Sequence, residues 1–258
     1  MKKLSILFIA NSFADDTIQY MPNIAKELGY DLDVFNLYIG GCDVNTHINN
    51  LLQNNHVYEL RIYNKEKDVW ETELDVSSND FIPTRKWDYV VLQQSSASSG
   101  LKDALIRVKE LVALVKEKLI SQDTQFVWNM TWSYPTYSDL EVFKDCYNSD
   151  QLGMYKLIVN NVKTSIIPDK DFVKIIPNGT AMMNARQYVK DEVLHRDGFH
   201  LSYQPGRYLA GLTACATLLD ANISNVKFRP EPITDELRDI FIKCAIDANK
   251  NPFEVTKK

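Results

Sequence analysis

The sequence has no long apolar run, no cluster of basic residues and few cysteines. No stretch approaches the roughly 18 apolar residues that a membrane-spanning helix requires, so we expect no membrane partner. Lysine and arginine together number 29, against 34 aspartates and glutamates. Because nucleic-acid binding needs a basic surface, we also exclude a nucleic-acid partner. The four cysteines are scattered without the spacing of metal ligands, which indicates a reduced compartment and no metal site.

The N-terminus lacks the features that would complete an export signal. Met1, Lys2 and Lys3 precede an apolar run, as in a signal peptide, but the run stops at Asn11 and no small-residue cleavage site follows. We therefore expect a soluble, cytoplasmic chain, unless an export signal was removed before residue 1. No internal repeat or linker divides the 258 residues, and a single domain over 1–258 is the prediction.

Five apolar stretches of strand length alternate with helical patterns along the chain. The strands are expected at 4–10, 31–37, 87–93, 124–130 and 172–176. This alternation predicts a five-stranded parallel sheet with helices on both faces, a three-layer α/β/α flavodoxin-like sandwich, because right-handed crossovers place helices there. An alternating segment at about 56–76 predicts an inserted β-hairpin.

Helical spacing of apolar residues predicts the covering helices. They are expected from the caps Asp15 and Asp16 to Leu28, over 101–120, over 139–167 with an irregularity near Asn148, over 181–189, through Ala214 toward Leu219, and over 234–248.

Ser12 directly follows the first predicted strand. In an open parallel sheet, ligands bind in the crevice outside the carboxyl ends of the strands, which makes Ser12 a candidate nucleophile. The alternative is that Ser12 only forms a turn or caps a helix. Asp197 and His200 lie three positions apart in a predicted loop after the fifth strand, where a carboxylate can reach the imidazole. The alternative is that His200 caps the next helix or packs on Tyr203.

Several polar positions follow the predicted strands in the same way. Gly41 follows the second strand, Gln93 and Gln94 follow the third, and Asn129 belongs to the end of the fourth. Because these carboxyl ends share one edge of the sheet, the convergence favours a Ser-His-Asp hydrolytic site. The Gly-x-Ser-x-Gly elbow of α/β-hydrolases does not occur in the chain.

These motifs resemble those of the SGNH, or GDSL-type, hydrolase superfamily. Ala10-Asn11-Ser12-Phe13 is similar to the Gly-Asp-Ser-Leu block, and Asp197-Gly-Phe-His200 matches the Asp-x-x-His block. The resemblance implies Ser12 as the nucleophile, His200 as the base and Asp197 as the acid. Asn36-Leu-Tyr-Ile-Gly-Gly41 resembles the second block, which implies that the amides of Gly41 and Ser12 form an oxyanion hole.

The family's third block, Gly-x-Asn-Asp, is absent, and Gln93-Gln94-Ser95-Ser96 stands in its place. An oxyanion hole needs a further preorganised donor, which Gln94 or Asn129 can supply. The choice between these two amides stays open at the level of the sequence. The Gln-Gln stretch resembles a largely uncharacterised bacterial branch of SGNH-like proteins.

The predicted function is therefore a serine esterase that hydrolyses a short acyl ester, acetyl above all, through an acyl-enzyme on Ser12 and without a cofactor. Aromatic residues near the fourth strand, with Trp132 and Tyr134 as the predicted substrate-binding residues, favour a carbohydrate ester as substrate. The alternative is that these rings only pack in the core or at the rim.

Three other functions remain open. The first is a flavodoxin-like module that binds a small ligand without covalent chemistry. The second is a metal-dependent phosphoesterase that uses Asp197 and His200. The third is acyl transfer to an acceptor other than water, which would use the same residues as the esterase.

Overall fold

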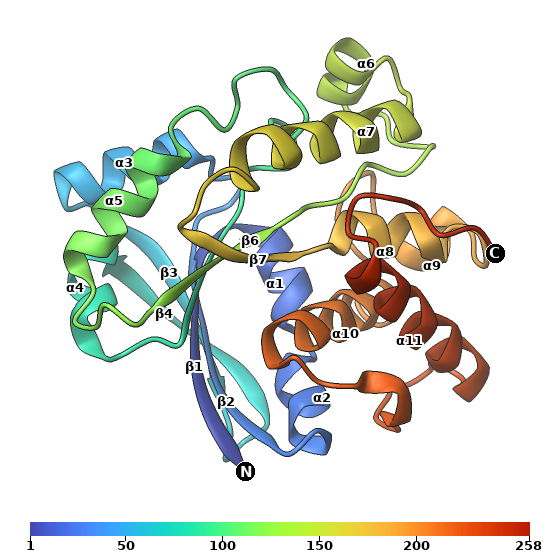
Figure 1. The fold of residues 1–258 in the computed structure, drawn as a ribbon, viewed down its shortest axis with the longest axis horizontal. Helices are drawn as coiled ribbons and strands as arrows, with labels where there is room; N and C mark the ends of the chain where they lie inside the picture. The colour runs from blue at the N-terminus through green and yellow to red at the C-terminus, as the bar shows by residue number, and fades with distance from the viewer.

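The computed structural model describes all 258 residues and contains one sheet of seven strands. Its order is β4-β3-β2-β1-β5-β6-β7. The strands are β1 (Lys2–Ala10), β2 (Tyr30–Tyr38), β3 (His56–Asn64), β4 (Val69–Ser77), β5 (Tyr89–Leu92), β6 (Gln125–Asn129) and β7 (Phe172–Ile176). Figure 1 shows the sheet between two groups of helices.

The sheet is mixed, which corrects the prediction of a five-stranded parallel sheet. Strands β2, β1, β5, β6 and β7 run parallel to one another. The hairpin β3–β4 pairs antiparallel with β2 and so extends the same sheet to seven strands. The polar alternation of the hairpin fits an edge position, where one side of the strands meets water.

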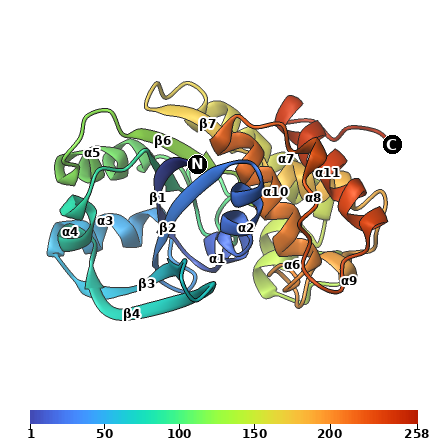
Figure 2. The ribbon, with the colours of Figure 1, turned by 90° about the horizontal axis from the view of Figure 1, so that it is seen from below.

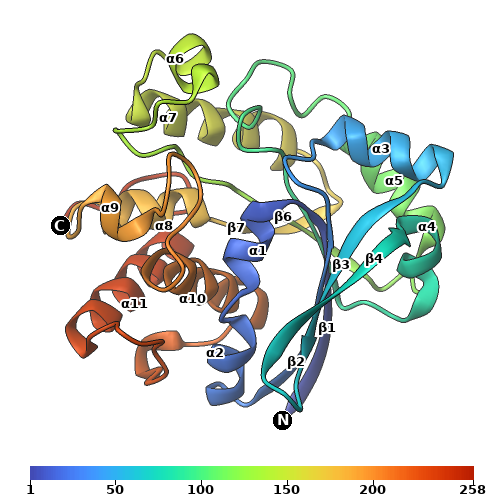
Figure 3. The same ribbon diagram turned by 180° about the vertical axis from the view of Figure 1, so that it is seen from behind.

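One face of the sheet is covered by helices from both ends of the chain, as Figures 1 and 3 show. These are α1 (Ser12–Ile18), α2 (Met21–Glu27), α8 (Asn178–Ala185), α10 (Pro205–Leu219) and α11 (Asp235–Lys250), with α9 (Asp191–Leu194) and the short η3 (Ile223–Asn225) beside them. None of the helices in the molecule combines the length with the apolar character that spanning a bilayer requires.

The opposite face carries the helices from the middle of the chain, and Figure 2 shows the first of them to the left of β1 and β2, away from the helices at the end of the chain. They are α3 (Val44–Gln53), α4 (Ser78–Phe81), η1 (Ile82–Thr84), α5 (Val108–Lys118), α6 (Glu141–Tyr147), α7 (Gln151–Asn161) and the π-helical turn η2 (Val162–Ile166).

Several of the predicted helices differ in extent from the observed ones. The helix expected over 101–120 begins only at Val108, because Asp103 has a φ of 61° and interrupts any earlier helix. The irregularity expected near Asn148 is confirmed, since Asn148 ends α6 in the left-handed conformation. The helical pattern continues on both sides of this break, in α6 and α7.

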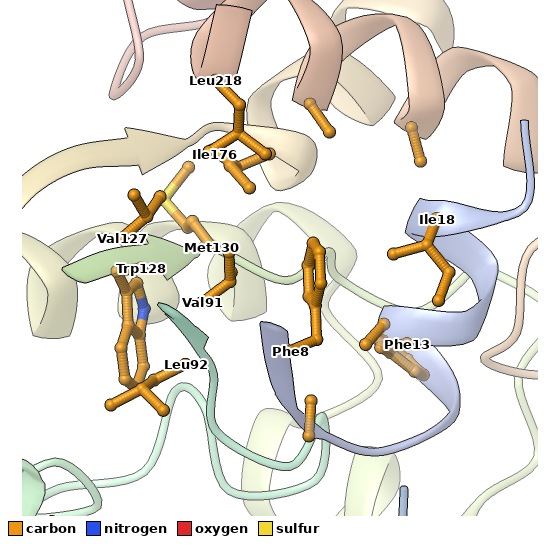
Figure 4. Packing of buried hydrophobic residues seen from close by; sticks show 14 of the residues in the cluster. Phe8, Phe13, Ile18, Val91, Leu92, Val127, Trp128, Met130, Ile176 and Leu218 are labelled. Atoms are coloured by element: carbon orange, nitrogen blue, oxygen red, sulfur yellow. The ribbon is translucent and has the colours of Figure 1, made fainter. Parts of the chain in front are cut away.

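The core fills both sides of the sheet. Figure 4 shows Val127 and Trp128, adjacent in β6, pointing to opposite faces, as the pleat of a strand requires. On one face, Phe8 of β1 lies near Ile18 of α1, and Ile176 lies near Leu218 of α10. Because both faces are buried, β1 is apolar at consecutive positions rather than at alternate ones.

Candidate active site

The turn from β1 into α1 places Ser12 at the carboxyl edge of the sheet. Asn11 has an extended backbone, and its side-chain oxygen accepts a hydrogen bond of 3.0 Å from the amide of Phe13. Asn11 is therefore the N-cap of α1, and Ser12 is the first residue of that helix. The expectation that Asp15 and Asp16 cap the helix is wrong, because α1 already begins at Ser12.

The loop between α9 and α10 holds Asp197 and His200 in a tight turn. The Oδ1 atom of Asp197 accepts hydrogen bonds from the amides of Phe199, at 2.9 Å, and His200, at 2.7 Å. This side-chain-to-backbone turn leaves Oδ2 free, and it lies 2.9 Å from Nδ1 of His200. Nε2 of the same imidazole lies 2.9 Å from Oγ of Ser12. The structure thus brings together three side chains from opposite ends of the chain.

The charge of Asp197 determines the direction of these hydrogen bonds. Burial raises the pKa of Asp197, but hydrogen bonds from the amides of His200 and Phe199 and from the imidazole outweigh this effect and lower it below the ordinary value. An ionised carboxylate only accepts hydrogen bonds, so Nδ1 of His200 donates to it. Nε2 then carries the lone pair and faces the hydroxyl of Ser12, the geometry needed to take up its proton.

The residues that flank Gly41 bond to the end of β1, directly before Ser12. The amide of Ile39 donates to the carbonyl of Ala10, at 3.2 Å, and the side-chain amide of Asn11 donates to the carbonyl of Cys42, at 2.9 Å. Gly41 itself has a φ of +65° and is exposed, and its N–H has no backbone acceptor. The N–H of Ser12 also lacks an intrahelical acceptor, because it belongs to the first turn of α1.

Gln94 and Asn129, the two candidates for a third oxyanion donor, both form hydrogen bonds with other groups of the protein. Both are buried. The side-chain oxygen of Gln94 accepts hydrogen bonds from the amides of Val44 and Ser95, while its nitrogen donates to the carbonyl of Ala104 at 2.6 Å. These contacts direct Gln94 toward the start of α3, so the structure does not support it as a donor at the site.

Asn129 belongs to a chain of buried side-chain amides that runs below α1. Gln93 donates to Asn11 at 2.7 Å, Asn129 donates to Gln93 at 2.8 Å, and Asn178 donates to Asn129 at 2.9 Å. The chain joins the carboxyl ends of β1, β5, β6 and β7, and Thr17 of α1 accepts further bonds from it. Asn129 therefore ties the strand ends together, and the expectation that it faces an oxyanion is not met.

Trp132 and Tyr134, the predicted substrate-binding residues, are 0% and 1% exposed, so neither ring can stack on a ligand. Trp132 stacks on Phe13 with 4.1 Å between the ring centroids and donates its indole proton to the carbonyl of Phe199. The hydroxyl of Tyr134 lies 2.9 Å from that of Ser96. The rings belong to the support of the His200 loop, which corrects the substrate-binding prediction.

Sequence reasoning missed the buried ion pairs beside the site. Asp16 of α1 is fully buried and pairs with Arg196, at 2.9 Å, and with Arg207, at 2.8 Å. The helical spacing offered a signal, because Asp16 is one turn beyond Ser12, on the same side of the helix. Arg196 directly precedes Asp197, so a contact between α1 and this loop brings acid and arginine together.

The family relation of the chain follows from a comparison with known domains. The model of DUF4886, a domain of unknown function, matches residues 5–248. The chain belongs to the DUF4886 family. A crystal structure of a DUF4886 family protein from Bacteroides uniformis is similar to it over 99% of this chain and 98% of the other, with 30% sequence identity and a TM-score of 0.93.

A second solved structure has a fold similar to that of this DUF4886 chain. It is similar to that of a protein from Slackia heliotrinireducens, provisionally assigned to the SGNH hydrolases, with 19% identity and a TM-score of 0.52 over 84% of this chain and all of the other. At this identity the similarity shows a shared fold, which agrees with the fold implied by the resemblance to the SGNH/GDSL-type superfamily. No functionally curated protein matches the chain.

Proposed function

We propose that this protein is a serine esterase that hydrolyses a short acyl ester, acetyl above all, on a small molecule or a carbohydrate. The observation that carries the proposal is the continuous path of hydrogen bonds from Asp197 through His200 to Ser12, with 2.9 Å at each of the two steps. A hydroxyl, a base and an orienting acid in this order constitute an activated nucleophile.

The proposed reaction proceeds in two halves. Nε2 of His200 takes the proton of Ser12 while Oγ forms a bond to the ester carbonyl carbon. The tetrahedral intermediate then expels the alcohol, which receives its proton from His200, and leaves an acyl group on Ser12. Water repeats these steps, releasing the acid and restoring the hydroxyl. Asp197 keeps its charge throughout and stabilises the imidazolium that forms twice per cycle.

The backbone amides of Ser12 and Gly41 are the proposed oxyanion donors. Both N–H groups lie at the carboxyl edge of the sheet, and the bonds around Ile39 and Cys42 hold the Gly41 loop against the end of β1. A preorganised donor of this kind typically contributes about 3 kcal/mol to transition-state stabilisation. Gln94 and Asn129 were considered as a third donor, and because their amides bond to other groups the proposal includes only the two backbone amides.

The surroundings of the site support a polar alcohol group as the leaving half. Tyr137 is 44% exposed, and its hydroxyl donates to the carbonyl of Asp197. Tyr203 is 57% exposed and follows His200 by three residues. Exposed tyrosine rings combine an apolar face with a polar tip, as sugar binding requires. We therefore place the carbohydrate contacts on Tyr137 and Tyr203 instead of the buried Trp132 and Tyr134.

The test combines covalent labelling with turnover of an aryl acetate. A fluorophosphonate is expected to modify Ser12, as located by peptide mass spectrometry, and the wild type is expected to hydrolyse the ester equally well with and without a chelator. The Ser12→Ala variant should lose both, whereas Ser96→Ala, which changes a nearby serine bonded to Tyr134, should keep both.

Three outcomes would contradict the proposal in different ways. Labelling absent from the wild type would favour a non-covalent binding module. Turnover abolished by the chelator would favour a metal-dependent phosphoesterase. Turnover retained in Ser12→Ala would remove Ser12 from the reaction.

A further inference from the structure

Helix α1 carries a second side chain that contacts the His200 loop, one turn beyond Ser12. Asp16 is fully buried, although burial of a carboxylate is costly unless charged or hydrogen-bonding partners surround it. Its Oδ1 accepts hydrogen bonds from Arg196 and Arg207, and its Oδ2 accepts one from the backbone amide of Leu201 at 2.8 Å. Each of these partners of the Asp16 carboxylate thus belongs to the His200 loop or to α10.

The contacts of Asp16 lie on both sides of the residues that reach Ser12. Arg196 immediately precedes Asp197, and Leu201 immediately follows His200. The guanidinium of Arg196 also donates to the carbonyl of Leu201, and the backbones of His195 and Leu201 form a bridge. The segment from Arg196 to Leu201 is therefore a closed loop whose two ends meet at one carboxylate.

We infer that Asp16 is a positioning residue, which holds the loop against α1 so that Nε2 of His200 stays within hydrogen-bonding distance of Ser12. The inference rests on the proposed function for its kinetic consequences, but its structural part stands on the contacts alone. Ser12 and Asp16 occupy one short helix, so the nucleophile and the anchor of its base move as one rigid unit. Arg207 joins the same anchor to α10.

The test replaces Asp16 by asparagine, with Asp15→Asn as the matched control. Asparagine can still accept the Leu201 amide but no longer pairs with two guanidinium groups. Asp15 carries the same charge on the same helix, yet it bonds to Asn36 and Arg61 and makes no contact with the His200 loop. The control therefore removes an equal charge from α1 while leaving the loop contacts in place.

The expected result has two independent parts. Hydrogen exchange of the peptide spanning 196–202 should become at least tenfold faster in Asp16→Asn and stay unchanged in Asp15→Asn. The kcat for an aryl acetate should fall about 10²-fold with KM nearly constant, as expected for a displacement of about 1 Å within a catalytic group. In Asp15→Asn, kcat should stay within about threefold of the wild type.

A purely structural role would produce a different pattern. The NMR signals of the His200 ring report its orientation and should shift in Asp16→Asn at temperatures well below unfolding. Unchanged ring signals, unchanged exchange over 196–202 and unchanged kcat would overturn the inference. If Asp16→Asn does not fold, Arg196→Gln removes one end of the loop contact and should give the same pattern with about tenfold lower kcat; wild-type exchange and kcat in that variant would equally overturn it.

The two proposals can fail separately. If the wild type shows neither labelling of Ser12 nor ester hydrolysis, the proposed function fails, while exchange and NMR of the Asp16 variants still decide whether this carboxylate holds the loop. If the wild type is active and Asp16→Asn matches it in exchange, ring signals and kcat, only the positioning role fails.

Discussion

The polar groups at the two halves of the sheet's carboxyl edge differ in exposure and in hydrogen bonding. At β1 and β2, Ser12 stays accessible and Gly41 is exposed, with an N–H that no backbone carbonyl accepts. At β5 and β6, Gln93, Gln94 and Asn129 are buried and bonded to one another or to neighbouring backbone. A polar residue at a strand end is therefore available for chemistry only where the fold leaves it accessible to a ligand.

The difference follows from the covering layers. The amide chain of Gln93 and Asn129 lies below α1, where Thr17 and Asn178 close it off from solvent. Buried amides need partners, since an unpaired one costs about 1–3 kcal/mol. The Gly41 loop, in contrast, is anchored only through its flanking residues and remains at the surface. Substitutions in the buried amide chain should therefore lower stability, and substitutions at the accessible Ser12 and Gly41 edge should lower turnover.

The largest effect is expected for His200→Gln on the accessible side. Removal of the base should lower kcat/KM for an aryl acetate by at least about 10⁴-fold. Only 17% of the imidazole side chain is exposed, but glutamine keeps a polar side chain at this position, so the free energy of unfolding should change by less than about 1 kcal/mol. Steady-state kinetics and urea denaturation measure the two quantities. A loss of stability that parallels the loss of turnover would contradict the expectation that the accessible half of the edge acts on turnover alone.

On the buried side, Asn129→Leu should act mainly on stability. The substitution leaves the side-chain oxygen of Gln93 and the nitrogen of Asn178 without their shared partner. We expect the free energy of unfolding in urea to fall by about 3 kcal/mol. Asn160→Ala, at an exposed position of α7, is the control and should change it by less than about 0.5 kcal/mol. A stable but inactive Asn129→Leu protein would indicate that Asn129 takes part in the reaction.

A comparable effect is expected from pH, because His47 of α3 is buried, with Nδ1 3.0 Å from the hydroxyl of Tyr58. Burial lowers the pKa of His47 to about 4. Below pH 6.5 the unfolded state then binds more protons than the folded state, so stability is complete above pH 6.5 and is lost as the pH falls toward 4. The loss amounts to about 3 kcal/mol.

Urea denaturation at several pH values between 7 and 4 measures this dependence. The slope should become flatter in His47→Gln and should persist in His56→Gln, whose histidine is exposed on β3. An equally steep slope in His47→Gln would assign the acid sensitivity to other groups.

The smallest effect is expected for Gly41→Ala. The left-handed backbone of Gly41 costs an alanine about 1–2 kcal/mol, while no atom lies within 4 Å of the added Cβ. The midpoint of thermal unfolding should therefore fall by a few degrees, and Gly40→Ala, without a positive φ, should lower it less. Equal midpoints for both variants would mean that the loop relaxes, and the Gly41 amide would then not be preorganised.

Much of the site was predictable from sequence, and the exceptions share a cause. Ser12, Asp197 and His200 follow strands or occupy a short motif, so local patterns indicated them, and the structure brings them together. Gln94 and Asn129 also follow strands, yet they point elsewhere. Strand position predicts where the backbone ends, but the direction and pairing of a long amide side chain depend on neighbours from distant segments.

The fold shows the same division. Strand positions and their parallel order follow from apolar runs and crossovers, and both could be read along the chain. The hairpin's place in the sheet could not, because it depends on β3 pairing with β2 rather than standing apart. Likewise, the burial of Trp132 depends on Phe13 and on the carbonyl of Phe199, which lie far from it in sequence.

The sequence by itself determined the alternation of strands and helices, the serine after the first strand and the Asp-x-x-His loop, since each rests on spacing within a few residues. Only the tertiary structure decided which polar groups remain accessible and which form hydrogen bonds in the amide chain or ion pairs with Asp16. The reason is physical: buried groups form hydrogen bonds with segments far away in the chain, 191 residues away in the contact of Arg207 with Asp16, and a local sequence pattern does not contain this information.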